Sequence, residues 1–288
     1  MATVLIGGLV IGSIYVIVAL GYNLALLGSG AFNFAQASVV MFATFTGYQF
    51  GFADGLPLPV VVLLSGAIGA VIGLVTELVA IRPVVDRGSH GELVTTVGVS
   101  IILEGVAVLI WGDQPLKLRP IASADIVTIA GGRVAQDGLL IIAFAAVAFI
   151  GLWAWSRYTI SGLVCLASSE DRTAATLRGL DTRRVSMLSL AAAGALGGLA
   201  GPVVGTATFA VVTLGLVITL KSFLALAIGG FGSFPGAAVG GITVGLTEAL
   251  IARYLGAAWV SISLFVFLLA VLYLKPNGLF GAKIERQV

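Results

Sequence analysis

Long apolar runs alternate with short polar connections along the whole chain. An apolar run of about 20 residues is long enough to cross the hydrocarbon core of a bilayer as an α-helix. Such runs predict nine membrane-spanning helices, at residues 3–27, 36–52, 60–81, 93–111, 139–156, 186–207, 215–232, 237–255 and 258–274. The second and seventh are short, so we expect about eight to ten spans. The pattern predicts an all-α fold, a polytopic bundle of membrane helices.

Composition agrees with a membrane protein and gives no sign of a separate soluble domain. Of the 288 residues, 59% are hydrophobic and 10% are charged, whereas soluble domains carry about 25% charged residues. The longest polar stretches, residues 112–138 and 157–185, are too short to bury a core of their own. We therefore expect one transmembrane domain over residues 1–288. Its apolar N-terminus has no leading basic residues, which is not typical of a cleaved signal peptide.

The distribution of basic residues predicts the orientation of the chain, because cytoplasmic loops are enriched in Lys and Arg. If residues 157–185 are cytoplasmic, ten basic residues share their side: Arg82, Arg87, Arg157, Arg172, Arg178, Arg183, Arg184, Lys275, Lys283 and Arg286. The opposite side holds four, Lys117, Arg119, Arg133 and Arg253, and Lys221 falls within a span. This bias predicts an external N-terminus and a cytoplasmic C-terminus.

The polar stretch 157–185 contains a short helix with its own start and stop signals. Ser168 followed by Asp171 has the spacing of a capping box, and Gly179 suits a left-handed C-cap. Ala167, Asp171, Ala175 and Gly179 recur every four residues, so a helix would present them on one face. Because that face is small apart from the aspartate, we expect it to meet a partner surface outside the bilayer.

Two glycine-rich segments interrupt the apolar pattern, at residues 28–36 and 229–236. Irregular backbone at membrane depth is tolerated where protein buries it or where it lines a watery cavity, and paired interruptions in two halves of a chain point to a transport site. The alternative is that both segments are tight turns between helices at the membrane surface. The sequence leaves both interpretations open.

Ionisable residues occur inside or at the ends of the predicted spans. Glu77 is close enough in sequence to Arg82 to anchor the cytoplasmic end of its span. Charges at membrane depth are costly, so they pair or face water. A salt bridge between Lys221 and either Glu104 or Glu248 would satisfy both charges. Alternatively these residues line a solute pathway with two amides, and that pathway set is Asn33, Gln36, Glu104, Lys221 and Glu248.

Catalytic and metal-binding signatures are missing. The single cysteine, Cys165, excludes an internal disulfide, and the single histidine, His90, excludes a histidine cluster. Residues 215–222 end in Lys-Ser like a phosphate-binding loop, but Leu220 stands where that motif needs its second glycine. We expect no enzyme activity, cofactor or metal, and a nucleotide that drives transport must bind another chain.

Motifs throughout the chain resemble the membrane permeases of Liv-type branched-chain amino-acid ABC importers, and the length is closer to the H-type than to the M-type subunit. The matching segments, in the family's order, are Gly12-Ser13-Ile14-Tyr15, Ala19-Leu20-Gly21, Asn33-Phe34-Ala35, Arg82-Pro83, Glu170-Asp171, Ala175, Gly179-Leu180, Lys221, residues 229–237 and residues 275–281. The sequence departs from the family at Gln36-Ala37, where His-Gly is usual, and at Glu104, where Gln is common. These departures leave the substrate less certain.

The resemblance implies a multi-pass subunit of the bacterial inner membrane. It implies pairing with a second permease in a heterodimer or homodimer, two cytoplasmic ATP-binding subunits and a periplasmic solute-binding protein, with no nucleic acid. It makes 157–185 a coupling segment, and the ATPase-coupling residues are Ser169, Glu170, Asp171, Ala174, Ala175, Leu177, Gly179 and Leu180.

The implied substrate is a branched-chain or other hydrophobic amino acid; relatives carry urea, short amides and other small solutes. A different hypothesis is an ion-coupled secondary carrier with Glu104 and Glu248 as proton sites. The missing catalytic residues argue against a third, an intramembrane enzyme.

Overall fold

The computed structural model describes residues 1–85, 91–119, 121, 126–129, 131–276 and 278–281. Arg87, His90, Asn277, Lys283 and Arg286, which enter the sequence argument, lie outside the described residues. The described part is built from helices and one small hairpin, which confirms the all-α polytopic bundle.

Seven helical segments are long and apolar enough to cross a membrane. They are α1 (Ala2–Ser29), α3 (Leu58–Thr76) continuing through η2 (Glu77–Ile81) into α4 (Arg82–Val85), α5 (Glu92–Trp111), α6 (Gln136–Tyr158), α9 (Thr182–Thr208), α11 (Phe234–Tyr254), and η3 (Ala257–Trp259) with α12 (Val260–Leu274). The remaining two predicted spans are also helical. They form α2 (Gln36–Tyr48), which runs into η1 (Gln49–Ala53), and α10 (Leu214–Gly229).

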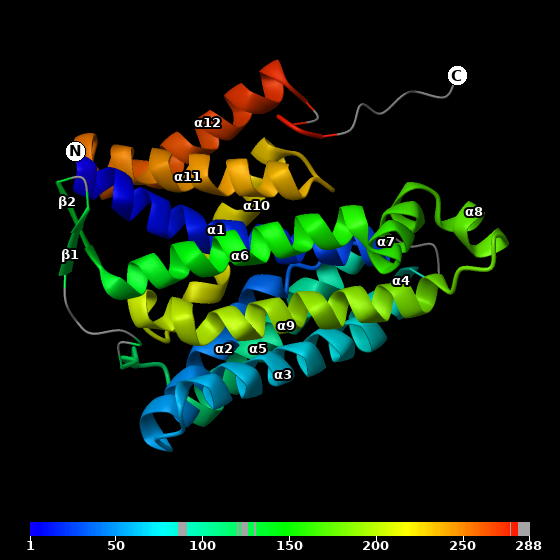
Figure 1. Ribbon diagram of the computed structural model, residues 1–288, viewed down its shortest axis with the longest axis horizontal. Coiled ribbons are helices and arrows are strands. Elements are labelled where there is room, and N and C mark those ends of the chain that lie inside the picture. Colours follow the sequence, from blue (N-terminus) through cyan, green and yellow to red (C-terminus); the bar gives the residue numbers. More distant parts are fainter. Residues whose placement is uncertain (86–90, 120, 122–125, 130, 277, 282–288) are drawn as a thin grey trace.

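The long helices lie side by side, and the short elements gather at the two ends of the bundle (Figure 1). One end carries the antiparallel hairpin of β1 (Ile126–Ile129) and β2 (Gly132–Ala135). The other end carries α4, α7 (Ile160–Glu170) and α8 (Arg172–Leu177). The sequence prediction missed the hairpin, although a β-branched run followed by a Gly-Gly pair is a hairpin signal.

Glycines let the helix backbones touch at the centre of the bundle. A Cβ added to Gly245 of α11 would lie 2.3 Å from the Cα of Gly12 in α1, and one added to Gly194 of α9 would lie 2.2 Å from the carbonyl oxygen of Gly69 in α3. In lipid, close packing of small residues replaces the hydrophobic effect between helices. These two contacts hold α1 on α11 and α3 on α9, which fixes the frame around the interior polar groups.

Candidate functional site: the exposed end helix and the polar interior

The segment after α6 folds as two helices joined at Asp171. The backbone of Asp171 is extended, and its carboxylate accepts a hydrogen bond from the N–H of Ala174 at 2.8 Å, so Asp171 is the N-cap of α8. The predicted capping box at Ser168 is wrong, because the Ser168 hydroxyl donates to the carbonyl of Val164 inside α7. The left-handed cap at Gly179 is confirmed, with φ of 84°.

The break at Asp171 also changes which residues share a surface. Ala167 belongs to α7 and Ala175 to α8, so the predicted small face on one continuous helix is wrong. Ala175 is 5% exposed and packs inward, whereas Leu177 is 84% exposed on the same short helix. Leu177 is thus a large apolar side chain left open at the α8 end of the bundle. The exposed predicted coupling residues beside it are Ser169, Glu170, Asp171 and Gly179.

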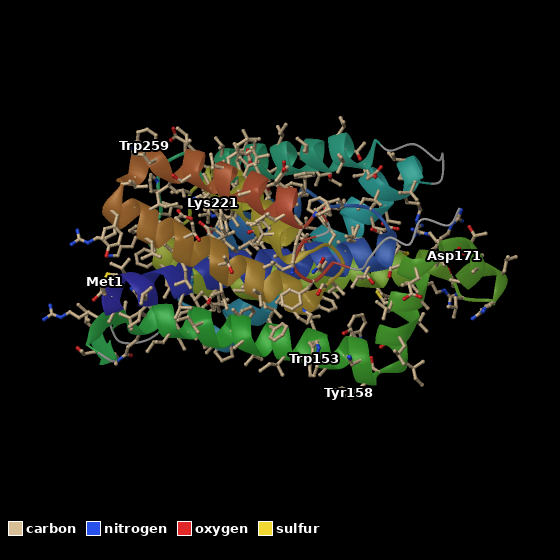
Figure 2. All side chains as sticks on the ribbon, turned by 90° about the horizontal axis from the view of Figure 1, so that it is seen from above. Met1, Trp153, Tyr158, Asp171, Lys221 and Trp259 are labelled. Atoms are coloured by element: carbon tan, nitrogen blue, oxygen red, sulfur yellow. The ribbon has the colours of Figure 1, made fainter. Side chains whose placement is uncertain are left out.

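Lys221 and Glu248 form an ion pair between α10 and α11, so of the two glutamates that the sequence offered as a partner, Glu248 and not Glu104 pairs with Lys221. The Tyr15 hydroxyl of α1 donates to the other Glu248 oxygen at 2.7 Å. The side chains of Lys221 and Glu248 are 20% and 14% exposed. Figure 2 shows Lys221 between the end that carries Met1 and the end that carries Asp171. The bridge therefore ties three helices together within the bundle.

Glu104 lies apart from this bridge, on α5. A Cβ added to Gly215 of α10 would lie 3.3 Å from a carboxylate oxygen of Glu104 and 3.0 Å from the Ser38 hydroxyl of α2. Glu104 is half-buried, and the Ser38 hydroxyl is buried with no hydrogen-bond partner among the described residues. The α2–α5–α10 contact thus holds a carboxylate and an unused hydroxyl.

The two predicted pathway amides are buried and hydrogen-bonded. The Asn33 side-chain oxygen accepts from the N–H of Ala35 at 3.1 Å, in the turn that leads into α2. Gln36 donates to the carbonyl of Ala193 on α9 at 2.7 Å. Both side chains are at most 2% exposed. In this conformation Gln36 joins α2 to α9, and Asn33 holds the turn before α2.

The two glycine-rich interruptions are short turns, and they meet. The α1–α2 turn begins with Gly30 at φ 71°, and the α10–α11 turn contains Gly230 and Gly232 at φ 107° and 76°. Asn23 of α1 holds the second turn with two bonds. Its amide donates to the carbonyl of Ser233 at 2.8 Å, and its oxygen accepts from the N–H of Gly232 at 2.9 Å. Asn23 was not predicted as a functional residue, because a contact across this sequence separation leaves no local pattern.

Charged groups at the α8 end include the predicted Glu77–Arg82 pair. A carboxylate oxygen of the buried Glu77 lies 3.8 Å from the Nε of Arg82, which confirms that pairing. Glu77, Arg82, Arg172 and Arg183 line one small cavity there. The described residues contain no group of three or more His, Cys, Asp or Glu side chains able to hold a metal ion.

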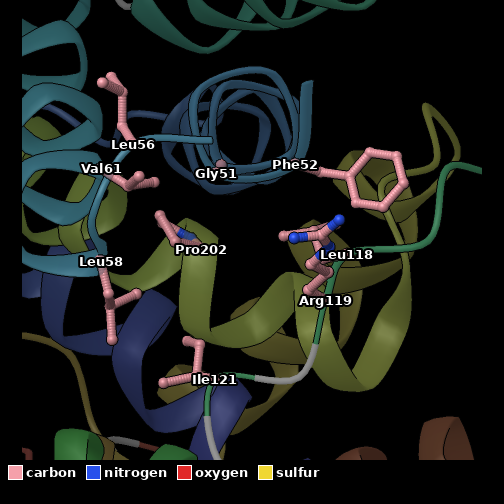
Figure 3. Close-up of a pocket in the computed structure, with 10 residues that line it drawn as sticks. Gly51, Phe52, Leu56, Leu58, Val61, Leu118, Arg119, Ile121 and Pro202 are labelled. Atoms are coloured by element: carbon pink, nitrogen blue, oxygen red, sulfur yellow. The ribbon is translucent and has the colours of Figure 1, made fainter. Parts of the chain in front are cut away.

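Each end of the bundle also has a hollow. At the hairpin end, a pocket of about 160 Å³ is lined by Phe52, Leu58, Val61, Arg119 and Pro202 among others (Figure 3). The Arg119 guanidinium lies 5.0 Å from the centre of the Phe52 ring. At the α7 end, a groove of about 940 Å³ is lined by residues that include Leu26, Trp153, Glu170 and Phe231.

The chain is similar to known transport proteins over most of its length. Residues 4–274 match the family described as "Branched-chain amino acid transport system / permease component". The chain belongs to this family. Its relatives include the permease protein LivH of Salmonella typhimurium, 30% identical over 95% of this chain and 93% of that protein. A probable LivH of Methanocaldococcus jannaschii is 28% identical over 96% of this chain and 92% of its own length.

A solved structure, PsaBC from Streptococcus pneumoniae in complex with Fab, aligns over 94% of this chain and 91% of its own, with 13% identity and a TM-score of 0.49. A similarity of that size adds nothing to the family assignment. Family membership confirms the resemblance found in the sequence, including the H-type subunit.

The chain is therefore the membrane permease component of an ATP-driven importer, a multi-pass protein of the bacterial inner membrane and not an enzyme. It works with ATP-binding and solute-binding components.

Proposed function

We propose that this chain carries a branched-chain or other hydrophobic amino acid into the cytoplasm as one of two permease subunits. The relatives named above are branched-chain amino-acid permeases, which supports the substrate. A second permease, most simply a related chain in a heterodimer, supplies the other half of the pathway. Two cytoplasmic ATP-binding subunits and a periplasmic solute-binding protein complete the importer.

The proposed topology has nine crossings, with α2 and α10 as the short ones, an external N-terminus and a cytoplasmic C-terminus. Its support is that Met1 and Asp171 stand at opposite ends of the bundle (Figure 2). Six arginines belong to elements of the α8 end: Arg82, Arg157, Arg172, Arg178, Arg183 and Arg184. At the other end, Arg133 belongs to the hairpin and Arg253 to the last turn of α11. The positive-inside rule then makes the α8 end cytoplasmic.

We infer a single permease domain, residues 1–288, with residues 157–185 as its coupling segment. The observation that carries this proposal is the exposed Leu177 on the capped helix α8. Burial of this side chain against a partner would remove apolar surface from water, which favours association. Leu177 would enter a groove of the ATP-binding subunit, with Ser169, Glu170, Asp171, Ala174, Gly179 and Leu180 around it. The buried Ala175 would support α8 from behind.

The solute path would run along the α2–α5–α10 contact, where Glu104 and Ser38 face Gly215. Asn33 and Gln36 would shape this path by fixing the α1–α2 turn. The Lys221–Glu248 bridge would support the wall of this path. A carboxylate that is paired with a lysine is poorly suited to repeated proton binding, so the bridge argues against Glu248 as a proton site. The weakly buried faces of α5 and α12 would receive the second permease.

The test is copurification of the ATP-binding subunit with tagged permease that carries Leu177→Asp. Full burial of a leucine side chain is worth about 1.5–3 kcal/mol, so recovery of the partner should fall by about tenfold or more. Gln114→Asp is the matched control, because it adds the same charge to an exposed loop residue beyond the far end of α5. Wild-type recovery with Leu177→Asp would rule out α8 as the docking site.

A further inference from the structure

Helix α8 is tied to the membrane bundle by Arg172, its first residue. The Arg172 guanidinium donates a hydrogen bond to the backbone carbonyl of Ser29, the last residue of α1. A Cβ added to Gly30 would lie 3.7 Å from the same guanidinium. The final carbonyls of a helix lack partners within the helix and carry partial negative charge, so a cation is favourable there. The guanidinium therefore caps the C-terminus of α1.

Ser29 is followed directly by the turn that carries two aromatic residues. The Phe32 ring lies 4.8 Å from the Phe34 ring, 5.4 Å from the Phe223 ring and 6.3 Å from the Phe231 ring, measured between centres. Phe223 belongs to the last turns of α10, and Phe231 to the α10–α11 turn. These four rings, here called the aromatic cluster, join the α1–α2 turn to the α10–α11 turn.

The aromatic cluster stands at the inner end of the proposed path. Phe231 is 44% exposed and lines the groove at the α7 end. The backbone N–H of Phe34 donates to the Thr96 hydroxyl of α5 at 3.2 Å. Glu104 follows Thr96 on α5 by about 12 Å, at a rise of about 1.5 Å per residue. The aromatic cluster thus reaches the inner groove through Phe231 and lies beside α5 about two turns before Glu104.

We propose that Arg172 is a positioning residue that passes ATP-driven movement of α8 to the aromatic cluster, which closes the inner end of the solute path. This inference rests on the proposed docking of the ATP-binding subunit at α8. Among the described residues, Arg172 is the α8 residue with a hydrogen bond to a residue outside the segment from α7 to α9.

Helix α1 contacts both turns: it leads into the α1–α2 turn at Ser29, and its Asn23 bonds the α10–α11 turn. Movement at Ser29 would therefore change the distance between the two turns. Asn23 fixes the α10–α11 turn less than two helical turns before Ser29. The Ser29 hydroxyl bonds back to the carbonyl of Ala25 at 2.7 Å, a contact that often accompanies helix bending. A shift of α8 would bend α1 between Asn23 and Ser29, and Phe32 and Phe34 would leave Phe223 and Phe231.

The test measures movement of this part of α1 without depending on the transported solute. Leu26, half-buried at the groove, is replaced by cysteine in a Cys165→Ser background, and the whole complex is placed in nanodiscs. Binding of ATP with hydrolysis blocked should change the maleimide labelling rate by about tenfold, an ordinary coupling size. With Arg172→Gln the change should fall below about twofold.

Two further variants separate transmission from a general effect on folding. Arg172→Lys should restore most of the ATP-dependent change, because an ammonium can donate to the same carbonyl. Arg178→Gln removes the same charge from an exposed neighbour and should leave the change at the wild-type level. An undiminished change with Arg172→Gln, or an equal loss with Arg178→Gln, overturns the inference.

Failure of docking can be told apart from failure of transmission. If Arg172→Gln releases the ATP-binding subunit, Arg172 acts in docking and the proposed transmission is wrong. If Leu177→Asp keeps that subunit bound, the proposed docking at α8 fails first. Phe231→Ala supplies an independent check on the aromatic cluster. It should let L-leucine leak through the permease without ATP, and a tight membrane would contradict the role of the rings.

Discussion

The bridge between Lys221 and Glu248 gives a sharp test of how the interior is stabilised. Lys221→Met removes the cation and leaves the Glu248 carboxylate with the Tyr15 hydroxyl alone. Breaking a buried pair costs about 3–5 kcal/mol, and we expect the lower end, about 3 kcal/mol, because both side chains keep partial exposure. The double variant Lys221→Met/Glu248→Gln removes both charges and should cost far less than Lys221→Met alone.

The assay is thermal unfolding of the purified permease in detergent, followed by size-exclusion chromatography. At about 2.1 cal/mol/K of unfolding entropy per residue, a loss of about 3 kcal/mol corresponds to a fall in Tm of about 5 °C in a chain of 288 residues. Leu220→Met, a change at an exposed neighbour on α10, is the control and should leave Tm unchanged. If Lys221→Met unfolds at the wild-type temperature, or if the double variant is no more stable than the single one, the bridge does not hold α10 and α11 together.

Three further outcomes follow from the packing and the interior. Gly12→Leu should lower the yield of folded protein, because its Cβ alone would lie 2.9 Å from the carbonyl of Gly241, at an overpacking cost of about 3 kcal/mol. Gly7→Leu, with open space on the same helix, should give wild-type yield by chromatography. Burial raises the pKa of the Cys165 thiol, so maleimide should label it at least about tenfold more slowly than an exposed cysteine and faster as pH rises, measured by mass spectrometry against Thr173→Cys. Glu104→Gln should retain uptake, since an amide keeps the hydrogen-bonding capacity of the path; a complete loss would show that the charge itself is needed.

The helices were predicted well from the sequence, because the length of an apolar run is a local property and a bilayer requires about 20 apolar residues for each crossing. All nine apolar runs became helices, and the left-handed cap at Gly179 was correct because glycine alone adopts that conformation freely. The start of α8 was wrong because Ser168 and Asp171 can each cap a helix. Tertiary contacts chose Asp171, from which Arg172 reaches α1.

The interior polar contacts were less predictable. A Lys–Glu bridge followed from the cost of buried charge, but the choice of Glu248 over Glu104 depends on how α10 packs on α11. The role of Asn23 in holding a turn more than two hundred residues away was missed for the same reason. Local patterns carry no information about which distant backbone an amide will meet.

The most direct test of the account is uptake of labelled L-leucine into proteoliposomes that contain the permease with its ATP-binding and solute-binding partners. We predict uptake that requires ATP, survives a protonophore and disappears with Leu177→Asp. Uptake that continues without ATP and collapses with a protonophore would contradict the central claim that α8 couples this permease to ATP hydrolysis.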